Sequence, residues 1–390
     1  MTTPGHACAG AGLSTRPDTR SALREALEET ASQVGAHPDL AVLFLTGEHA
    51  GRAGAVADEV AGRLAPDAWI GIPAPGVIGG GAEVQTGQGV AVWAARMPGA
   101  RVQAFHLELR DEGEERYVRG WPRLGPDAGV GLVADVFSFP IGPFLASLRQ
   151  SGEAPRIFGG LAGSGPPPER TTFLLDGEAK AGGAVGFAVD GSVSLLPLVS
   201  QGCRPVGPAF QVTRSERNVI YELDGAPAYD GLRQVLERMD DEARRDFASS
   251  PQIGLRKAAS GGEDPGAFLI RNLVGADPEE GTVVVGDHVR DGFTVRFHAR
   301  DAGSAHREFE EMLALASSLH PEPLGGLLFD CTGRGLHLFD EPHHDAALVQ
   351  RYFPGLPLAG MFAAGEIGPV QGQPQIHGFT ASLGLLVPAS

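Results

Sequence analysis

The sequence predicts an α/β protein of duplicated strand-helix-strand units that form mixed sheets covered by helices, in two related halves. Three observations predict this class. Short, wholly apolar runs alternate with stretches in which apolar residues recur every three or four positions, as strands and helices do. Glycine supplies 56 of 390 residues and marks corresponding turns. One glycine-rich pattern also occurs near both ends of the chain, which indicates an internal repeat.

The first residues predict a disordered tail over 1–16, rich in glycine, alanine and threonine. This tail lacks the basic segment and the continuous apolar segment of a secretory signal, so we expect a cytoplasmic protein. No stretch offers ~20 apolar residues free of helix breakers. The sequence therefore predicts no membrane span and no membrane partner.

The first half reads as alternating helices and strands. A helix face over 23–34 ends at Gly35, and the apolar run 41–45 is typical of a strand covered on both faces. The spacing over 56–64 predicts a second helix, and a strand over 90–95 follows the glycine-rich segment 70–81.

The internal repeat consists of two copies of the pattern G-x-x-A-x-G-x-I-G. A third, looser copy lies between them, with strands over 131–137 and 184–189 and a helix over 143–150. The residues that spell the pattern are Gly71, Ala74, Gly76, Ile78 and Gly79 in the first copy, and Gly360, Ala363, Gly365, Ile367 and Gly368 in the second.

A domain boundary is expected between residues 217 and 218, where a short strand, a turn and a charged helix begin a new pattern. This divides the chain into domains 17–217 and 218–390. Within the second domain, three strand candidates near 268–273, 282–285 and 294–299 predict an antiparallel meander.

Composition and motifs exclude several functions. A net charge of -17 repels phosphate backbones and makes nucleic acid an unsuitable partner. Three widely separated cysteines fit neither a disulfide framework nor a zinc site. Phosphate-binding loops, nucleophile elbows and zinc-protease motifs are absent, so the sequence predicts no cofactor and no metal.

The candidate site lies in the last 65 residues, where Cys331, Arg334, Glu366 and His377 stand beside glycines at strand ends, with Gly365 next to the carboxylate. If the repeat aligns these strands, the four side chains converge at one loop end. A half-exposed Arg334 would hold a carboxylate ligand with two hydrogen bonds. In the structural alternative, Arg334 and Glu366 form a buried ion pair, Cys331 fills the core and His377 donates to a carbonyl.

A second candidate cluster is the glycine-rich segment 158–165, with Gly160 and Ser164, followed downstream by Cys203 in segment 201–205. Its glycines permit close approach of a ligand or simply of a neighbouring strand. Both interpretations stay open.

At these positions the sequence resembles the FIST family, whose members pair an N-terminal with a C-terminal FIST domain. The resemblance implies a FIST N-terminal domain over 17–217, a FIST C-terminal domain over 218–390, and a sensory module that binds small ligands such as amino acids. It brings no established catalytic activity. The matching segments are 158–163, 200–207, 222–228, 298–301, 331–335, 365–369 and 377–380.

The chain departs from the family at 71–77, where a turn that is polar in relatives keeps its glycines and loses every polar side chain. The resemblance thus places a surviving ligand site in the C-terminal copy, and a separate signalling protein as partner. We expect a sensor of a small, anionic metabolite. The alternatives are an acyl-transfer enzyme with Cys331 as nucleophile, His377 as base and Glu366 as orienting carboxylate, or an interaction scaffold.

Overall fold

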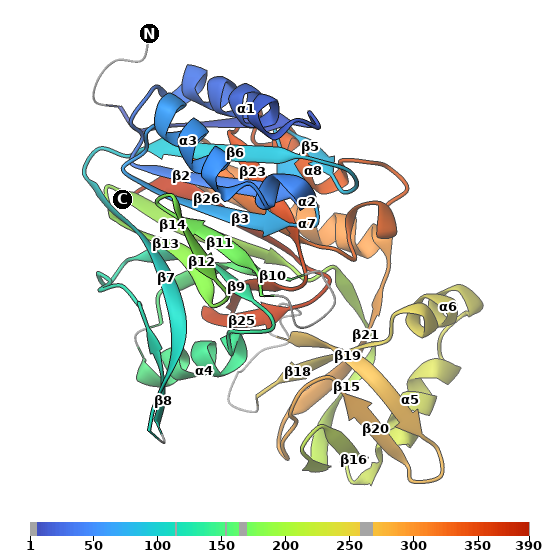
Figure 1. Ribbon diagram of the computed structural model, residues 1–390. Helices are drawn as coiled ribbons and strands as arrows, with labels where there is room; N and C mark the ends of the chain where they lie inside the picture. The colour runs from blue at the N-terminus through green and yellow to red at the C-terminus, as the bar shows by residue number, and fades with distance from the viewer. Residues whose placement is uncertain (1–5, 114, 153, 164–169, 258–267, 390) are drawn as a thin grey trace. The chain divides into compact units, whose positions relative to one another are not determined.

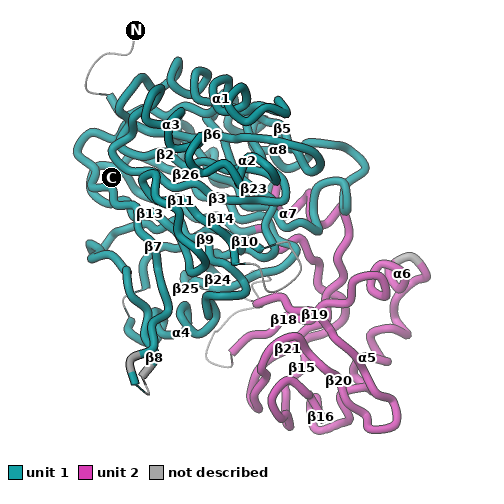
Figure 2. Tube along the Cα trace, viewed as in Figure 1, with its two compact units in different colours: residues 1–199, 310–390 teal, residues 200–309 magenta. Residues whose placement is uncertain are grey.

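Three sheets with related strand orders are built from the first and last parts of the chain, and a fourth from the residues between them (Figure 1). This computed structural model describes residues 6–113, 115–152, 154–163, 170–257 and 268–389. Two units result, one of residues 1–199 and 310–390 and one of residues 200–309 (Figure 2). The predicted class, α/β with mixed sheets covered by helices, is confirmed.

The first sheet has two helices on one face, because the apolar sides of α1 and α3 pack against alternate residues of its central strands. Asp18 begins α1 by accepting a hydrogen bond from the Ser21 N–H, and Gly35 ends it. The strand order is β1 (Cys8–Ser14), β6 (Val90–Arg96), β2 (Leu40–Thr46), β3 (Ala68–Ala74), β11 (Thr172–Leu175) and β12 (Glu178–Ala181), and the helices are α1 (Thr19–Val34), α2 (Gly47–Ala50) and α3 (Ala53–Arg63).

The predicted disordered tail is wrong for its second half, because Cys8–Ser14 forms strand β1 and pairs with β6 along its whole length. The physical reason is the small size of its residues. A Cβ on Gly12 would lie 2.2 Å from the Ala26 carbonyl oxygen, so glycine lets the strand lie directly beneath α1. Residues 1–5 lie outside the described residues.

The second sheet is covered by helix α4 (Ile141–Ser151), whose Ile141, Phe144 and Leu145 join its apolar face. Its strand order is β25 (Gln373–His377), β24 (Glu366–Val370), β10 (Arg156–Ala162), β9 (Gly129–Asp135), β13 (Ala184–Gly191), β7 (Ala100–Glu112) and β8 (Glu115–Arg119).

The third sheet contains β22 (Gly325–Cys331), which ends at Cys331 just before Arg334, whereas Glu366 and His377 lie on the β24–β25 hairpin of the second sheet. The order of the third sheet is β14 (Val193–Ser200), β26 (Ala381–Pro388), β22, β23 (Leu358–Ala363), β4 (Val77–Gly79) and β5 (Ala82–Val84). The helices of this region are α7 (Ala302–Leu319), the 3-10 turn η2 (Gly335–His337) and α8 (His344–Tyr352).

The three sheets share one plan. Each has a parallel pair at its centre, β2 with β3, β9 with β10, or β22 with β23, flanked by antiparallel strands. Each also receives a hairpin from another part of the chain: β4–β5 pairs with β23, β11–β12 with β3, and β24–β25 with β10. The predicted repeat segments therefore occupy corresponding places, and each hairpin joins the next sheet rather than its own.

One glycine recurs at the same register in each parallel pair. Gly71, Gly159 and Gly360 each lie opposite a leucine of the neighbouring strand. A Cβ on Gly159 or Gly360 would lie 1.9 Å from that leucine's carbonyl oxygen. Close backbone approach therefore accounts for glycine at 159 and 360, whereas a Cβ on Gly71 would lie 3.1 Å from the Leu174 side chain.

The three sheets meet in one apolar core. Phe44 and Phe158 both pack edge-on against Phe329, with ring centroids 5.8 and 5.6 Å apart. Each ring comes from a different sheet, so the core requires all three.

Residues 200–309 form an antiparallel sheet with its own apolar core, covered by α5 (Ala228–Glu237) and α6 (Asp241–Ser249). The three predicted strands exist, but their order as a meander is wrong, because β21 pairs with β15 and β18 rather than with β20. The predicted boundary at 217/218 lies between β15 and β16. The strand order is β15 (Cys203–Glu216), β21 (Thr294–Arg300), β18 (Gln252–Arg256), β19 (Leu269–Asp277), β20 (Thr282–Val285), β16 (Val219–Leu223) and β17 (Ala226–Pro227).

No helix within the described part of the chain is both long and apolar enough to cross a membrane.

Candidate functional site

Four of the predicted site residues, Cys331, Arg334, Glu366 and His377, lie in one region at the carboxyl ends of β22 and β23. Thr380 links them, since its carbonyl accepts from the Cys331 N–H at 3.0 Å and its own N–H donates to Glu366 Oε2 at 3.0 Å. Glu366 lies opposite His377 in the β24–β25 hairpin, and the Arg334 N–H donates to the Cys331 carbonyl at 2.8 Å. The repeat thus brings these residues together; that they bind a ligand stays a prediction.

Arg334 is fully buried, so the expectation of a half-exposed side chain is wrong. Its Nε and Nη2 atoms donate to the two carboxylate oxygens of Asp345 at 2.7 and 2.8 Å, while Asp330 lies 3.9 Å from Nε. Asp345 belongs to α8. The guanidinium carbon of Arg334 also lies 5.4 Å from the centroid of the Phe339 ring. Asp345 of the protein itself thus supplies the carboxylate that we expected a ligand to supply.

Two aspartates respond to this guanidinium in opposite ways. Burial, together with the charge of Asp345, raises the pKa of Asp330 well above its usual value. Neither carboxyl oxygen of Asp330 has a hydrogen-bond partner among the described residues. Burial also opposes ionisation of Asp345, but the charge and hydrogen bonds of Arg334 outweigh it and hold the pKa of Asp345 below its usual range. The surroundings therefore disfavour ionisation of Asp330 and favour ionisation of Asp345.

A residue of the first half completes this cluster. Glu83, on the hairpin strand β5, accepts from the N–H groups of Asp345 and Ala346 at 2.9 and 3.0 Å, where α8 begins. Burial and the charge of Asp345 raise the pKa of Glu83. The Glu83 N–H donates to His343 Nδ1 at 2.9 Å. The first hairpin thus supplies the N-terminal cap of a helix that lies far along the chain.

The contact of His377 is the one that the structural alternative expects, because its Nε2 donates to the Gly368 carbonyl at 3.1 Å. Cys331 is buried with 6% of its surface exposed, as that alternative also expects. His377 thus bonds within the β24–β25 hairpin of the second sheet, while Cys331 ends β22 of the third sheet.

The glycines of the second cluster have packing reasons. The Leu161 N–H donates to the Gly365 carbonyl at 2.8 Å, and a Cβ on Gly160 would lie 2.9 Å from the Phe329 ring. Ser164 lies outside the described residues. Cys203 begins β15 in the unit of residues 200–309 and is partly exposed.

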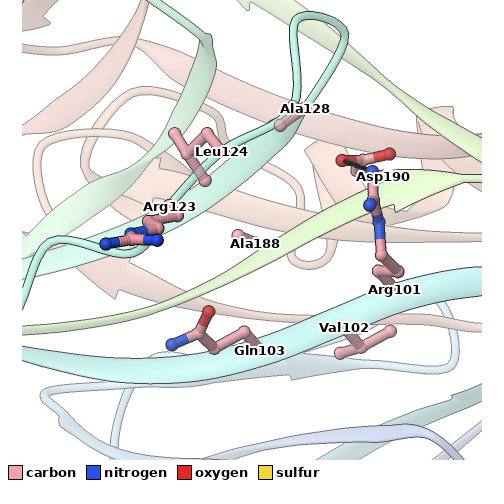
Figure 3. A pocket seen from close by; sticks show the side chains of 9 residues that line it. Arg101, Val102, Gln103, Arg123, Leu124, Ala128, Ala188 and Asp190 are labelled. Atoms are coloured by element: carbon pink, nitrogen blue, oxygen red, sulfur yellow. Dashed lines mark hydrogen bonds and ion pairs between the residues drawn. The ribbon is translucent and has the colours of Figure 1, made fainter.

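The first unit also has an open pocket of about 340 Å³ that the sequence did not indicate (Figure 3). Arg101 and Gln103 of β7 line it together with Asp190 of β13 and Arg123 of the loop after β8. Arg101 Nη2 lies 2.7 Å from Asp190 Oδ2, while Arg123 and Gln103 lie away from this ion pair (Figure 3). The remaining side chains are apolar: Val102, Leu124, Ala128 and Ala188.

A glycine holds the loop against this ion pair. A Cβ on Gly125 would lie 2.2 Å from Asp190 Oδ2 and 3.4 Å from Arg101 Nη2. The signal that was overlooked is an arginine enclosed by prolines and glycine, in segment 120–126 of an acidic chain.

The two sites differ in how their arginines are used. In the buried cluster, Arg334 bonds Asp345. The open pocket instead presents guanidinium and amide groups to open space. Within the described ranges, no three histidine, cysteine, aspartate or glutamate side chains are placed to hold a metal ion.

Known protein families and relatives are similar to this chain along almost its full length. The FIST N domain matches residues 39–226, and the FIST C domain matches residues 228–369. An uncharacterized protein of Mycobacterium tuberculosis is 37% identical over 385 residues, 97% of this chain and 99% of its own length. An uncharacterized protein of Mycobacterium bovis is 34% identical, over 97% of this chain and 98% of its own.

A more distant relative is an F-box/LRR-repeat protein of Arabidopsis thaliana, 26% identical over 175 residues, which are 42% of this chain and 32% of that protein. FIST domains are associated with sensory roles in signal transduction. With both domain types matched in order, this chain belongs to the FIST family.

Proposed function

We propose that this FIST protein is a cytoplasmic sensor that binds a small metabolite with a carboxylate, such as an amino acid, in the pocket lined by Arg101, Gln103, Arg123 and Asp190. The observation that carries the proposal is an open pocket with two guanidinium groups in a chain of net charge -17. Its volume of about 340 Å³ suits a small metabolite.

Arg123 is the group that would hold the carboxylate. It makes no ion pair with any described residue, and its side chain lies, like that of Gln103, on the side of the pocket away from the Arg101–Asp190 pair (Figure 3). A guanidinium matches a carboxylate with two parallel hydrogen bonds, and the amide adds a further donor. The opposite end offers Asp190, whose carboxylate suits the ammonium group of an amino acid.

The test is a thermal-shift screen of amino acids, and of the matching carboxylic acids without the amino group, followed by calorimetry on each compound that stabilises the protein. A ligand at 100 times its Kd stabilises the folded state by ~2.7 kcal/mol. We expect Arg123→Ala to abolish the shift. Arg116→Ala is the control, because Arg116 is an exposed arginine of β8 that pairs with Asp111 outside the pocket.

A ligand-induced shift that survives Arg123→Ala would contradict this location. It would then direct attention to the eight residues predicted from sequence. A complete screen without any shift would contradict the proposed function itself.

We also propose that a separate signalling protein carries the output of this sensor. We also infer that the three similarly built sheets arose by internal duplication, because corresponding glycines occupy the same register in each parallel pair.

A further inference from the structure

We propose that the first unit has a second ligand site, for the phosphate group of a small phosphomonoester, in a separate hollow between β7, β8 and β12. The hollow has a volume of about 360 Å³ and shares no lining residue with the pocket of Figure 3. Its cationic side chains are Arg110, Arg119 and Lys180. They come from three different strands, so the sheet and the neighbouring hairpin together place them around one space.

The two hollows lie on opposite faces of β7. Side chains alternate along a strand, so Arg101 and Gln103 point to one face and Glu108 and Arg110 to the other. Ligands can therefore occupy both hollows independently.

Arg119 is the uncommitted cation of this hollow. It lies opposite Glu108 in the β7–β8 pair, but Glu108 bonds Arg110 and lies 3.6 Å from His106 Nδ1. Arg119 makes no ion pair with any other residue that the structure describes. Gly120 fixes its position, because a Cβ there would lie 2.0 Å from the His106 carbonyl oxygen.

The charge balance selects the ligand class. Three cationic side chains and one carboxylate line the hollow, an excess of two positive charges once Glu178, which pairs with Lys180 from outside the hollow, is displaced. A phosphomonoester carries about -1.5 to -2 at neutral pH and so matches this charge, whereas a single carboxylate carries only half of it. Arginine and lysine are both suited to phosphate oxygens.

Lys180 has a competing partner outside the hollow. Its Nζ lies 2.6 Å from Glu178, whose side chain is 75% exposed. A bound phosphate can displace such an exposed partner at small cost, because exposed ion pairs contribute little. Removing the Glu178 charge should therefore assist phosphate binding.

The experiment titrates the full-length protein with glycerol 3-phosphate and with inorganic phosphate, by phosphorus NMR and calorimetry at low ionic strength. We expect saturable binding that weakens about tenfold or more in Arg119→Gln, because a hydrogen bond to a charged group is lost. Arg116→Gln removes the same charge from the same strand outside the hollow, and should stay within about twofold of the unmodified protein. Glu178→Gln should bind at least as tightly.

Equal weakening by Arg119→Gln and Arg116→Gln would overturn the site, since it would show only general attraction. Weaker binding in Glu178→Gln, or no phosphate binding at all, would also overturn it. Acetate and citrate are titrated in the same way as carboxylate controls. Binding of either one as tightly as glycerol 3-phosphate would show a carboxylate site instead. Unchanged melting temperatures confirm that the exposed variants remain folded.

Discussion

Arg334 shows how much a single residue depends on its surroundings. Among the fully buried side chains that the structure describes, only Trp93 is larger. Its charge is tolerated because Asp345 accepts both hydrogen bonds of the fork. Removing one partner of such a pair leaves the other charge buried without compensation.

We therefore predict that Arg334→Ala lowers the free energy of unfolding by ~3 to 5 kcal/mol at neutral pH, measured by urea denaturation. The control is Arg351→Ala, whose side chain is 67% exposed and pairs with Glu310. It should change stability by less than ~1 kcal/mol. Equal effects of the two substitutions would contradict a structural role for Arg334.

His298 gives stability a pH dependence. Burial lowers its pKa from 6.5 to about 4. The unfolded chain therefore binds a proton that the folded protein excludes, so stability falls as the pH decreases from 6.5 to about 4. The full loss from this group is about 3 kcal/mol.

We predict that His298→Gln, which cannot take up this proton, flattens the stability of the 200–309 unit across that pH range. Urea denaturation at several pH values measures the slope. An equal slope in the variant and the unmodified protein would assign the acid sensitivity to other groups.

At the scale of elements, the parallel pairs require glycine at one position. Gly159 has a φ of 147°, and a Cβ there would overlap the Leu132 carbonyl. A Cβ on Gly62, in α3, would have no other atom within 4 Å. Glycine is thus required in the strand and merely tolerated in the helix.

We predict that Gly159→Ala destabilises by about 3 kcal/mol or more, because the backbone must shift to remove the overlap. Gly62→Ala should raise stability by up to about 1 kcal/mol, through the better helix propensity of alanine. Thermal unfolding measures both. An unchanged melting temperature in Gly159→Ala would mean that β9 and β10 can move apart without a loss of stability.

At the scale of the whole molecule, the exchange of hairpins joins the two ends of the chain. Strand β4 pairs with β23, and β24 pairs with β10, so neither end completes its sheets alone. The central aromatic core likewise needs Phe329 between Phe44 and Phe158. Residues 200–309, in contrast, have a core of their own.

We predict that a fragment of residues 1–199 fails to fold, whereas a fragment of residues 200–309 folds. Circular dichroism and dispersion of amide NMR signals distinguish these outcomes. A cooperatively unfolding 1–199 fragment would show that the hairpin exchange is dispensable.

Local patterns predicted many elements correctly. The helix over 23–34 and the strands over 41–45 and 184–189 match α1, β2 and β13. These predictions succeeded because apolar periodicity reflects which face of a segment is buried. Strand β1 was missed because its small residues carry little apolar signal, and their close packing under α1 appears only when the helix is in place.

The candidate site could be predicted only as a neighbourhood. The repeat predicted that Cys331, Arg334, Glu366 and His377 converge; their chain segments lie in one region, but the Arg334 side chain bonds Asp345. Nothing near Arg334 indicated that Asp345 would neutralise it, because that pairing depends on how α8 packs. The open pocket was missed for the same reason, since Arg101, Arg123 and Asp190 belong to separate segments.

The fold class, the family, the repeated glycine pattern and the acidic character of this protein can all be read from its amino-acid sequence. These properties follow from composition, local periodicity and short motifs. The tertiary structure decided which hairpin joins which sheet, which charges are buried and where space remains for a ligand. Such properties depend on contacts between residues far apart in the chain, because burial and pairing arise only when those segments pack together.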